Sequence, residues 1–544
     1  MALKEIADAN VPQPVSTEHS TIIITSSNHS TKGNQQEEGL QSPYVDSSSS
    51  PVIHLNNLIP NKELNRKLKI WGIYEKVALI GEGSISNIYR VRKRTSPQKG
   101  FLLCCFSRSK QYNEDESSHA NSTYYALKTI DTRSVNESYL EEMRNEIDIF
   151  KSLDHPHLLK AYETYHSQKK ICIIMELCTG GDLYSRFPYS ERHAGEIMTS
   201  LLSAVSYMHK NNIMHRDLKF ENIMFESDAR DAPVKIIDFG LSKKYLDPSV
   251  VVSERVGTIY TMAPEVIETK PYSFKADMFS LGVIAYMLLS HQKPFWGMNK
   301  WELERSITAC IYNFDGKVWK TITNDAKDFI RSILIKNPDK RLSAEEAKKH
   351  IWLQKMSLLS SKIPDPSLID DVEQSLVRYA DSGEFKRLVL NVLAHRTTSD
   401  DIKNLRVAFD SFDSENDGII SHKEFKEQLL RFNLSEEEVN KMFESIDVNH
   451  TGNILYHEFL AATLETQHYI EEAKLRDAFD SIDSDESGYI SKEDLYSILG
   501  NNCLESYIEQ IIQEVDTDSD GLVSFEDVLK VFRDQKKSDV LTSM

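Results

Sequence analysis

The chain has 544 residues, and its 83 acidic side chains outnumber 64 basic ones, which gives a net charge of −19 and an isoelectric point near 5.4. This balance argues against non-specific binding to nucleic acid or anionic membranes. Hydrophobic residues make up 40% of the chain, and no stretch approaches the roughly 20 apolar residues that cross a bilayer. Six cysteines without metal-ligand spacing favour a reducing, cytoplasmic compartment: Cys104, Cys105, Cys172, Cys178, Cys310 and Cys503.

The chain divides by composition into a polar start and a structured remainder. Residues 1–65 are rich in Ser, Thr, Asn, Gln and Pro, so we expect a disordered tail. From Tyr74 to about Trp352, short β-like runs precede long stretches of helical periodicity. This order predicts an α+β unit at 74–352, with a small β-rich lobe followed by a larger helical lobe.

A long interruption separates two strands of the first lobe. Residues 94–123 stand where a short turn would normally join neighbouring strands, so we interpret them as an insertion loop. Within it, residues 101–110 hold two adjacent cysteines and nearby basic residues, and a palmitoylated contact with a membrane is one interpretation. An ordinary loop with a small apolar anchor is the interpretation we favour.

The last part of the chain contains a repeat. Acidic loops begin at Asp413, Asp447, Asp483 and Asp516, and each follows a stretch with apolar residues at helical spacing. The repeat predicts an all-α unit at 399–535 with four helix–loop–helix motifs in two pairs. Residues 353–398 form the helical junction before it, and residues 536–544 form a short tail after it.

Several motifs between residues 74 and 352 occur in the order and at the spacing that protein kinases show. The motifs are "GEGSIS" at 81–86, "YALK" at 125–128, "RNEIDIF" at 144–150, "HRDLKFEN" at 215–222, "DFG" at 238–240 and "APE" at 263–265. This unit therefore resembles a protein kinase. The resemblance implies a two-lobed kinase fold, and "GTIYTMAPE" with "LKFEN" favours serine/threonine specificity. It also implies that Arg341 is the buried partner of Glu265.

The resemblance assigns a role in phosphoryl transfer to six residues. Asp217 would orient the acceptor hydroxyl and take its proton, and Lys219 would neutralise the transferring phosphoryl group. Asn222 and Asp238 would bind Mg²⁺. Lys128 would hold the ATP phosphates, with Glu146 as its ion-pair partner.

The expected ATP site comprises a glycine-rich loop, the phosphate and metal ligands, and a hinge. Glycines let backbone amides approach phosphates closely, and Met175 would limit the depth of the adenine pocket. The nucleotide-binding set is Gly81, Gly83, Ile88, Lys128, Met175, Glu176, Cys178, Asn222 and Asp238.

Two further expectations concern the substrate and the activation segment. Asp182 and Glu221 stand where basophilic relatives accept an arginine three residues before the target, so we expect protein substrates with Ser or Thr near basic residues. Glu254 could pair with Arg216 in place of an activating phosphate. Ser253 keeps phosphorylation open as the alternative.

Each repeated loop has the oxygen pattern of an EF-hand, with ligands at positions 1, 3, 5, 7 and 12 and glycine at position 6. The second loop has only two carboxylates and should bind Ca²⁺ more weakly. The last two loops end on aspartate, which favours Mg²⁺ more than glutamate does, so Glu424 and Glu458 are the better candidates for the regulatory response. Loop 413–424 offers Asp413, Glu415, Asp417, Ile419 and Glu424, and loop 447–458 offers Asp447, Asn449, Thr451, Asn453 and Glu458. Loop 483–494 offers Asp483, Asp485, Ser487, Tyr489 and Asp494, and loop 516–527 offers Asp516, Asp518, Asp520, Leu522 and Asp527.

A kinase domain followed by four EF-hands resembles the calcium-dependent protein kinases of plants and protists. The resemblance implies a monomeric enzyme that uses ATP, Mg²⁺ and Ca²⁺ and that is held inactive by its junction until Ca²⁺ binds. Residues 375–399 are amphipathic, with basic residues nearby, as is typical of a calmodulin target, although a helix packed against the kinase is the alternative interpretation. Two alternatives stay open: a calcium-responsive scaffold with a silent kinase fold, and a calcium buffer.

Overall fold

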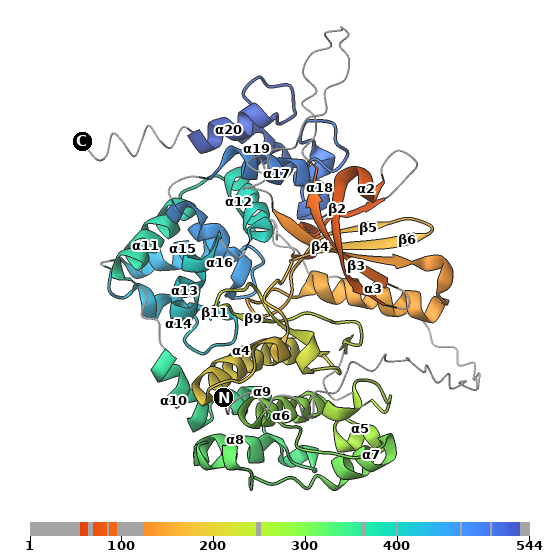
Figure 1. Ribbon diagram of the computed structural model, residues 1–544. Helices are drawn as coiled ribbons and strands as arrows, with labels where there is room; N and C mark the ends of the chain where they lie inside the picture. Colours follow the sequence, from red (N-terminus) through yellow and green to blue (C-terminus); the bar gives the residue numbers. More distant parts are fainter. Residues whose placement is uncertain are drawn as a thin grey trace, which may run out of the picture. The chain divides into compact units, whose positions relative to one another are not determined.

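The computed structural model describes residues 55–63, 69–83, 86–94, 123–245, 252–360, 365–398, 401–432, 434–467, 470–500 and 503–533. Figure 1 shows a sheet-rich lobe, a helical lobe and a second group of helices that ends the chain. The expected insertion at 94–123 lies almost entirely outside the described residues, as do the proposed membrane contact at 101–110 and the tail at 536–544.

The small lobe is built on a six-stranded sheet with the strand order β1-β5-β6-β4-β3-β2. Adjacent pairs are antiparallel, except that β1 runs parallel to β5. Helix α3 packs against the lobe. The bounds are β1 Asn61–Glu63, α2 Ile70–Ile73, β2 Tyr74–Glu82, β3 Ser86–Lys93, β4 Tyr124–Asp131, α3 Glu137–Ser152, β5 Ala161–His166 and β6 Lys170–Met175.

Side chains along β4 alternate between the two faces of the sheet and so enter two different hydrophobic cores. Tyr125 and Leu127 are buried in a small core of the sheet lobe, whereas Ala126 belongs to the large core that continues into the helical lobe. Because side chains alternate between faces along a strand, Lys128 lies on the same face as Ala126. The strand therefore directs its lysine toward the cleft between the lobes.

The large lobe surrounds helix α6, in which every residue from Ala276 to Ser290 is buried. The short strand pairs β7–β10 and β8–β9 contact helix α4 through β7 and β9, and the loops that carry Asp217 and Asp238 follow these two strands. The bounds are α4 Glu191–Lys210, β7 Ile213–Met214, β8 Ile223–Phe225, β9 Val234–Ile236, β10 Lys243–Lys244, α5 Pro264–Ile267, α6 Lys275–Ser290, α7 Lys300–Ala309, α8 Asn324–Ile333, α9 Ala344–Lys348 and α10 Ile351–Ser360.

The C-terminal region contains four helix–loop–helix units in two pairs, as the repeat predicts. Strand β11 pairs with β12 through Ile420 and Ile454, and an isolated bridge joins Ile490 to Val523. The bounds are α11 Pro366–Ala380, α12 Glu384–Arg396, α13 Lys403–Phe412, β11 Ile419–Ser421, α14 His422–Leu429, α15 Glu436–Ile446, β12 Asn453–Leu455, α16 Tyr456–Thr463, α17 Glu472–Ile482, α18 Lys492–Leu499, α19 Glu505–Val515 and α20 Phe525–Arg533.

The N-terminal boundary differs from the sequence prediction. Residues 55–63, expected to be disordered, form α1 (Leu55–Leu58) and β1, and the side chains of Leu58 and Ile59 are buried. The prediction was wrong here because such a short apolar run gains its stability from partners far along the chain.

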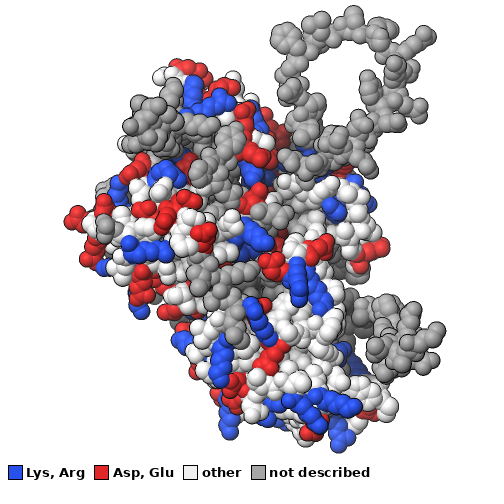
Figure 2. Space-filling view, turned by 60° about the vertical axis from the view of Figure 1, so that its left-hand side comes forward, with Lys and Arg blue, Asp and Glu red and all other residues white. Residues whose placement is uncertain are grey.

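The surface carries both signs of charge. Figure 2 shows acidic side chains concentrated on its left and upper parts, while lysine and arginine gather at its lower end, where the large lobe lies. Among the described residues, no helix is long and apolar enough to cross a membrane.

Candidate functional site

A buried ion pair links strand β4 to helix α3 in the cleft. The Nζ atom of Lys128 lies 2.6 Å from Oε1 of Glu146. Burial alone would lower the pKa of the lysine, but Glu146 and then Asp238 raise it above its usual value. The pair therefore holds a charged ammonium where the sequence motif places the phosphate-binding lysine.

The loop after β7 brings three predicted residues into one hydrogen-bonded cluster. The Nζ atom of Lys219 lies 2.7 Å from Asp217 Oδ2 and 2.9 Å from Thr258 Oγ1. The hydroxyl of Thr258 donates to Asp217 Oδ1 at 2.7 Å, and Asn222 Nδ2 donates to Asp217 Oδ2 at 3.1 Å. The carboxylate of Asp217 is thus held by three neighbours in an orientation set before any substrate arrives.

Asp238 lies two residues after the end of β9, at the start of the loop that leads to β10. Its Oδ1 accepts a hydrogen bond from the amide of Gly240 at 3.0 Å. The next residue, Phe239, is fully buried and stacks edge-on against Phe150 of α3 at 5.0 Å between ring centroids. Packing of Phe239 therefore couples the position of Asp238 to that of α3, which also carries Glu146.

The predicted nucleotide-binding residues line the same side of the sheet. Gly83 donates its amide to the carbonyl of Ser86 at 2.8 Å, which closes the glycine-rich turn. Ile88 pairs with both Gly81 and Lys128 across neighbouring strands.

The predicted hinge begins at the end of β6. Met175 is buried and faces Ala126 in the strand register. The Glu176 amide donates to the Lys160 carbonyl at 2.9 Å, and burial raises the pKa of the Cys178 thiol. Ala126, opposite Met175, lies on the same strand as Lys128, which links the predicted hinge to the predicted phosphate-binding lysine.

The activation segment contains the ion pair that the sequence suggested. Arg216 lies 2.6 Å from Glu254 Oε2, and Lys243 lies 2.9 Å from its Oε1. Partial burial would raise the pKa of Glu254, but hydrogen bonds from Lys243 and Arg216 lower it overall. A carboxylate here joins the segment to the catalytic loop without a phosphate group. The expected pair of Arg341 with Glu265 is also present, at 2.6 Å and fully buried.

Two residues that the sequence analysis did not single out support this site. Asp277 of α6 accepts hydrogen bonds from the backbone amides of His215 and Arg216, each at 2.9 Å, and holds the loop that carries Asp217. Thr258 is the second residue to support Asp217. The position of Thr258 between the "DFG" and "APE" motifs could have marked it in the sequence as a residue of the activation segment. Asp277 lies on an apolar helix outside the motifs, so the sequence offered no such signal for it.

The substrate-facing rim contains the two acidic residues expected to bind arginine. The carboxylate of Asp182 accepts from the Ser185 amide at 3.1 Å, and burial raises its pKa. Glu221 accepts a hydrogen bond of 2.5 Å from the hydroxyl of Tyr260. The pKa of that hydroxyl is raised by burial and by Glu221.

The four EF-hand loops share one backbone arrangement. In each loop the carboxylate at position 1 accepts from the amide of the glycine at position 6, at 2.8 Å, and each glycine has a positive φ. The carboxylate at position 12 accepts from the amide at position 9, with distances from 2.7 to 3.0 Å. The same two contacts to the backbone therefore recur in all four loops.

The loops differ in how closely their carboxylates converge. Within the described part of the chain, two sets bring three carboxylate oxygens within 4.8 Å of one another: Asp483, Asp485 and Asp494 in the third loop, and Asp516, Asp518 and Asp520 in the fourth. The second loop has too few carboxylates for such a set. In the first loop, the Asp417 carboxylate instead lies 2.6 Å from Lys210 of α4.

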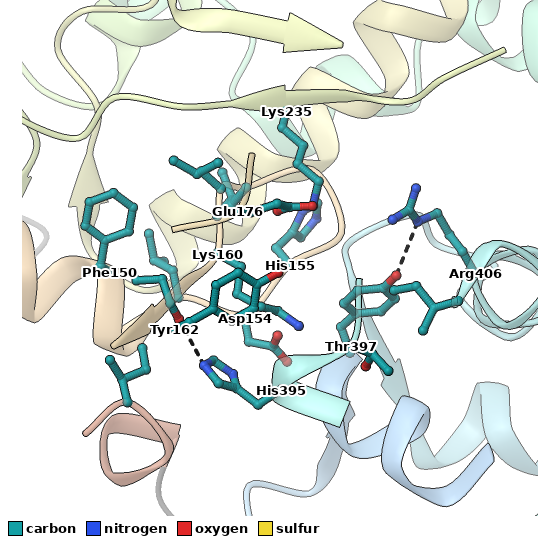
Figure 3. Close-up of a pocket in the computed structure, with 17 residues that line it drawn as sticks. Phe150, Asp154, His155, Lys160, Tyr162, Glu176, Lys235, His395, Thr397 and Arg406 are labelled. Atoms are coloured by element: carbon teal, nitrogen blue, oxygen red, sulfur yellow. Dashed lines mark hydrogen bonds and ion pairs between the residues drawn. The ribbon is translucent and has the colours of Figure 1, made fainter. Parts of the chain in front are cut away.

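The junction and the EF-hand region contact both lobes of the kinase through buried polar pairs. Arg406 of α13 lies 2.7 Å from Glu226, Arg396 of α12 lies 3.0 Å from Glu163 of β5, and His457 lies 2.8 Å from Asp154. Asp154, His395 and Arg406 also line a small cavity, in which His395 Nε2 lies 2.9 Å from the Ala161 carbonyl of β5 and Arg406 donates to the Tyr456 hydroxyl at 3.2 Å (Figure 3).

Comparison with known proteins agrees with both halves of this architecture. A protein kinase domain model matches residues 115–353, and a model for EF-hand domain pairs matches residues 402–464 and 472–533. The fold and the site thus define a protein kinase joined to two pairs of EF-hands.

Three similar proteins match most of the length of this chain. Calcium-dependent protein kinase 5 of Plasmodium falciparum is 32% identical over 485 residues, which cover 87% of this chain and 81% of that protein. Calcium-dependent protein kinase 7 of Oryza sativa is 35% identical over 400 residues, 72% of this chain and 73% of that protein. Calcium-dependent protein kinase 13 of Arabidopsis thaliana is 33% identical over 402 residues, covering 72% and 75%.

The chain belongs to the calcium-dependent protein kinase family and is a calcium-activated serine/threonine protein kinase. The expected fold class and enzyme class are confirmed, and so is the use of ATP and Ca²⁺ that the two domain types imply.

Proposed function

We propose that Asp217 is the base that orients and deprotonates the acceptor hydroxyl, with Lys219 neutralising charge on the transferring phosphoryl group. The hydrogen-bonded cluster of Asp217, Lys219 and Thr258 is the observation that carries this assignment. Phosphoryl transfer depends mainly on positioning and electrostatic stabilisation, and this cluster supplies both. Lys128, held by Glu146, would bind the ATP phosphates.

Magnesium fits the remaining residues of the cleft. Asp238 and Asn222 offer hard oxygen donors, which Mg²⁺ prefers, and both lie on loops that face Lys128 and Asp217. The ion would neutralise phosphate charge and keep the phosphoryl group in line with the acceptor. Asp238 lies close enough to Lys128 to attract its ammonium electrostatically. The lysine and the metal site would therefore act on the same phosphates.

The chain would act as a monomer. It would be organised as a kinase domain at 74–352, a junction at 353–398 and a calmodulin-like domain at 399–535. Both EF-hand pairs contact helix α12 of the junction, through α16, α17 and α19. Its apolar side chains Phe385, Leu388 and Val389 are buried, as expected of a calmodulin target.

The end of α12 reaches the kinase behind the catalytic cleft. His395 Nε2 lies 2.9 Å from the Ala161 carbonyl of β5, and Arg396 pairs with Glu163 on the same strand. These contacts support a switch in which calcium binding holds the junction against the outside of the small lobe, away from the substrate site.

Substrates would carry a basic residue near the target serine or threonine. Asp182 and Glu221 place two carboxylates at the rim, with a Coulombic interaction between them, and such a pair suits the guanidinium of an arginine. A neutral replacement of either residue should raise KM for a basic peptide more than it changes kcat.

The alternatives, a silent scaffold and a calcium buffer, do not account for the assembled cluster around Asp217. The decisive experiment measures phosphate transfer to a basic serine peptide, with calcium and with chelator, for the native protein and for Asp217→Asn. Calcium-stimulated transfer that the variant loses supports the proposal. Transfer independent of calcium contradicts the switch, and no transfer under any condition supports the scaffold.

A further inference from the structure

The short segment at residues 57–63 joins two hydrophobic cores. Leu58 is 6% exposed and packs in the core formed by the junction and the EF-hands. Its neighbour Ile59 is 3% exposed and packs in the core of the kinase. Because consecutive side chains enter different cores, the segment lies at the boundary between the two domains.

On the kinase side, the segment extends the sheet at its β5 edge. The carbonyl of Pro60 accepts from the Thr164 amide at 2.9 Å, and the side chain of Asn61 accepts from the Thr164 hydroxyl at 3.1 Å. Strand β1 then runs parallel to β5, with Asn61 opposite Thr164. An edge strand with unpaired backbone groups is a ready acceptor for such an added strand.

On the EF-hand side, the segment reaches the helix that leaves the third calcium loop. The side-chain amide of Asn57 donates to the carbonyl of Ile498 in α18 at 2.8 Å. Helix α1 packs against both α18 and α3. Helix α3 carries Glu146, so the segment touches the element that positions Lys128 and the element that follows a metal loop.

We propose that residues 57–63 are an intramolecular peptide ligand for a composite groove made by β5, α3 and α18. The groove needs both domains, because Thr164 belongs to one and Ile498 to the other. The bound segment therefore favours the arrangement in which the third EF-hand lies beside α3. Docking of the segment stands on its own, whereas its effect on activation rests on the proposed function.

The test compares Leu58→Asp with Leu504→Asp in the full chain. Leu504 lies just before α19, in the EF-hand pair that contains α18, and it is 61% exposed. Its variant therefore controls for the added charge. Asn57→Ala, which removes only the bond to Ile498, is the milder second variant in case Leu58→Asp fails to fold.

Two readouts separate docking from its consequence. Hydrogen exchange at Thr164 and across 492–500 should speed up about tenfold in Leu58→Asp and less in Asn57→Ala, with no change in Leu504→Asp. Unchanged exchange in both test variants would overturn the docking, whatever the kinase activity. The calcium concentration for half-maximal phosphate transfer should rise about threefold in Leu58→Asp, by linkage. Faster exchange without that rise would overturn the coupling to activation.

Discussion

Lys210, at the end of kinase helix α4, lies 2.6 Å from the carboxylate of Asp417 in the first EF-hand loop, 207 residues later in the chain. The nearby Lys348 donates to the carbonyl oxygens of Glu415 and Asn416 in the same loop, at 3.1 and 3.0 Å. Asp417 stands at position 5, where the EF-hand pattern predicts a ligand, so we expect the ammonium of Lys210 to compete with a calcium ion for this carboxylate.

Replacing Lys210 with alanine should increase calcium affinity at the first EF-hand. The lysine is 42% exposed at its side chain, so we expect a modest effect, roughly a two- to threefold lower dissociation constant. Isothermal titration of the full chain measures it. Lys349→Ala, an exposed lysine that pairs with Glu345, is the control, and equal affinity in both variants would contradict the competition.

Glu254→Gln should reduce phosphate transfer without unfolding the protein. Glutamine keeps the size of the side chain but removes the charge that joins Arg216 to Lys243. We expect a fall in kcat of about tenfold, since the catalytic loop loses its tie to the activation segment. Glu268→Gln removes a pair on the surface with Lys270 and should leave kcat unchanged. Full activity of Glu254→Gln would show that the pair is not needed.

Asp154→Asn should loosen the contact between the kinase and the second EF-hand. Both partners are buried, and burial would raise the pKa of Asp154, but His457 lowers it overall, so the carboxylate is charged. The buried hydrogen bonds that Asp154 accepts from the His457 amide and ring would be weakened, which should cost roughly 1–3 kcal/mol. Thermal unfolding should show a lower midpoint or two separated transitions, while Asp148→Asn on the exposed side of α3 should behave like the native protein.

Stability should fall as the pH is lowered from about 6.5 toward 4, because of His157. Burial lowers the pKa of this histidine to about 4, whereas the unfolded chain takes up a proton near pH 6.5. Over this window the unfolded state binds more protons, so each pH unit costs up to ~1.4 kcal/mol. Chemical denaturation between pH 4 and 7.5 measures the slope. His157→Gln should flatten it, and an unchanged slope would assign the effect to other groups.

Asp527→Glu should make the fourth EF-hand more selective for calcium. Aspartate is one methylene shorter than glutamate and less readily offers both oxygens, which favours six-coordinate Mg²⁺. Here Asp527 Oδ1 is also engaged by Thr517 and Lys530. With millimolar magnesium present, the variant should bind calcium several-fold more tightly. Calcium titrations with and without magnesium decide this, and unchanged affinity would refute it.

Much of the site could be recognised in the sequence because its parts are local. Asp217, Lys219 and Asn222 lie within six residues on one loop, and each EF-hand places its ligands within twelve. A local backbone conformation is enough to bring such residues together, so spacing carries the information.

Contacts between distant segments were beyond the reach of spacing. The roles of Asp277 under the catalytic loop, of Lys210 at the first EF-hand and of residues 55–63 at the sheet edge emerge only when segments far apart in the chain pack together. Composition marked residues 55–63 as part of a disordered tail, since Leu58 and Ile59 are too few to form a core alone.

The sequence by itself therefore determined which residues are expected to transfer phosphate, which loops are expected to bind metal and where the junction is expected to lie. Only the tertiary structure decided which surfaces of the kinase meet the junction and the EF-hands, through Asp154 with His457, Arg396 with Glu163 and Lys210 with Asp417. The physical reason is that these pairs depend on the packing of whole domains, and no local pattern records which surfaces meet.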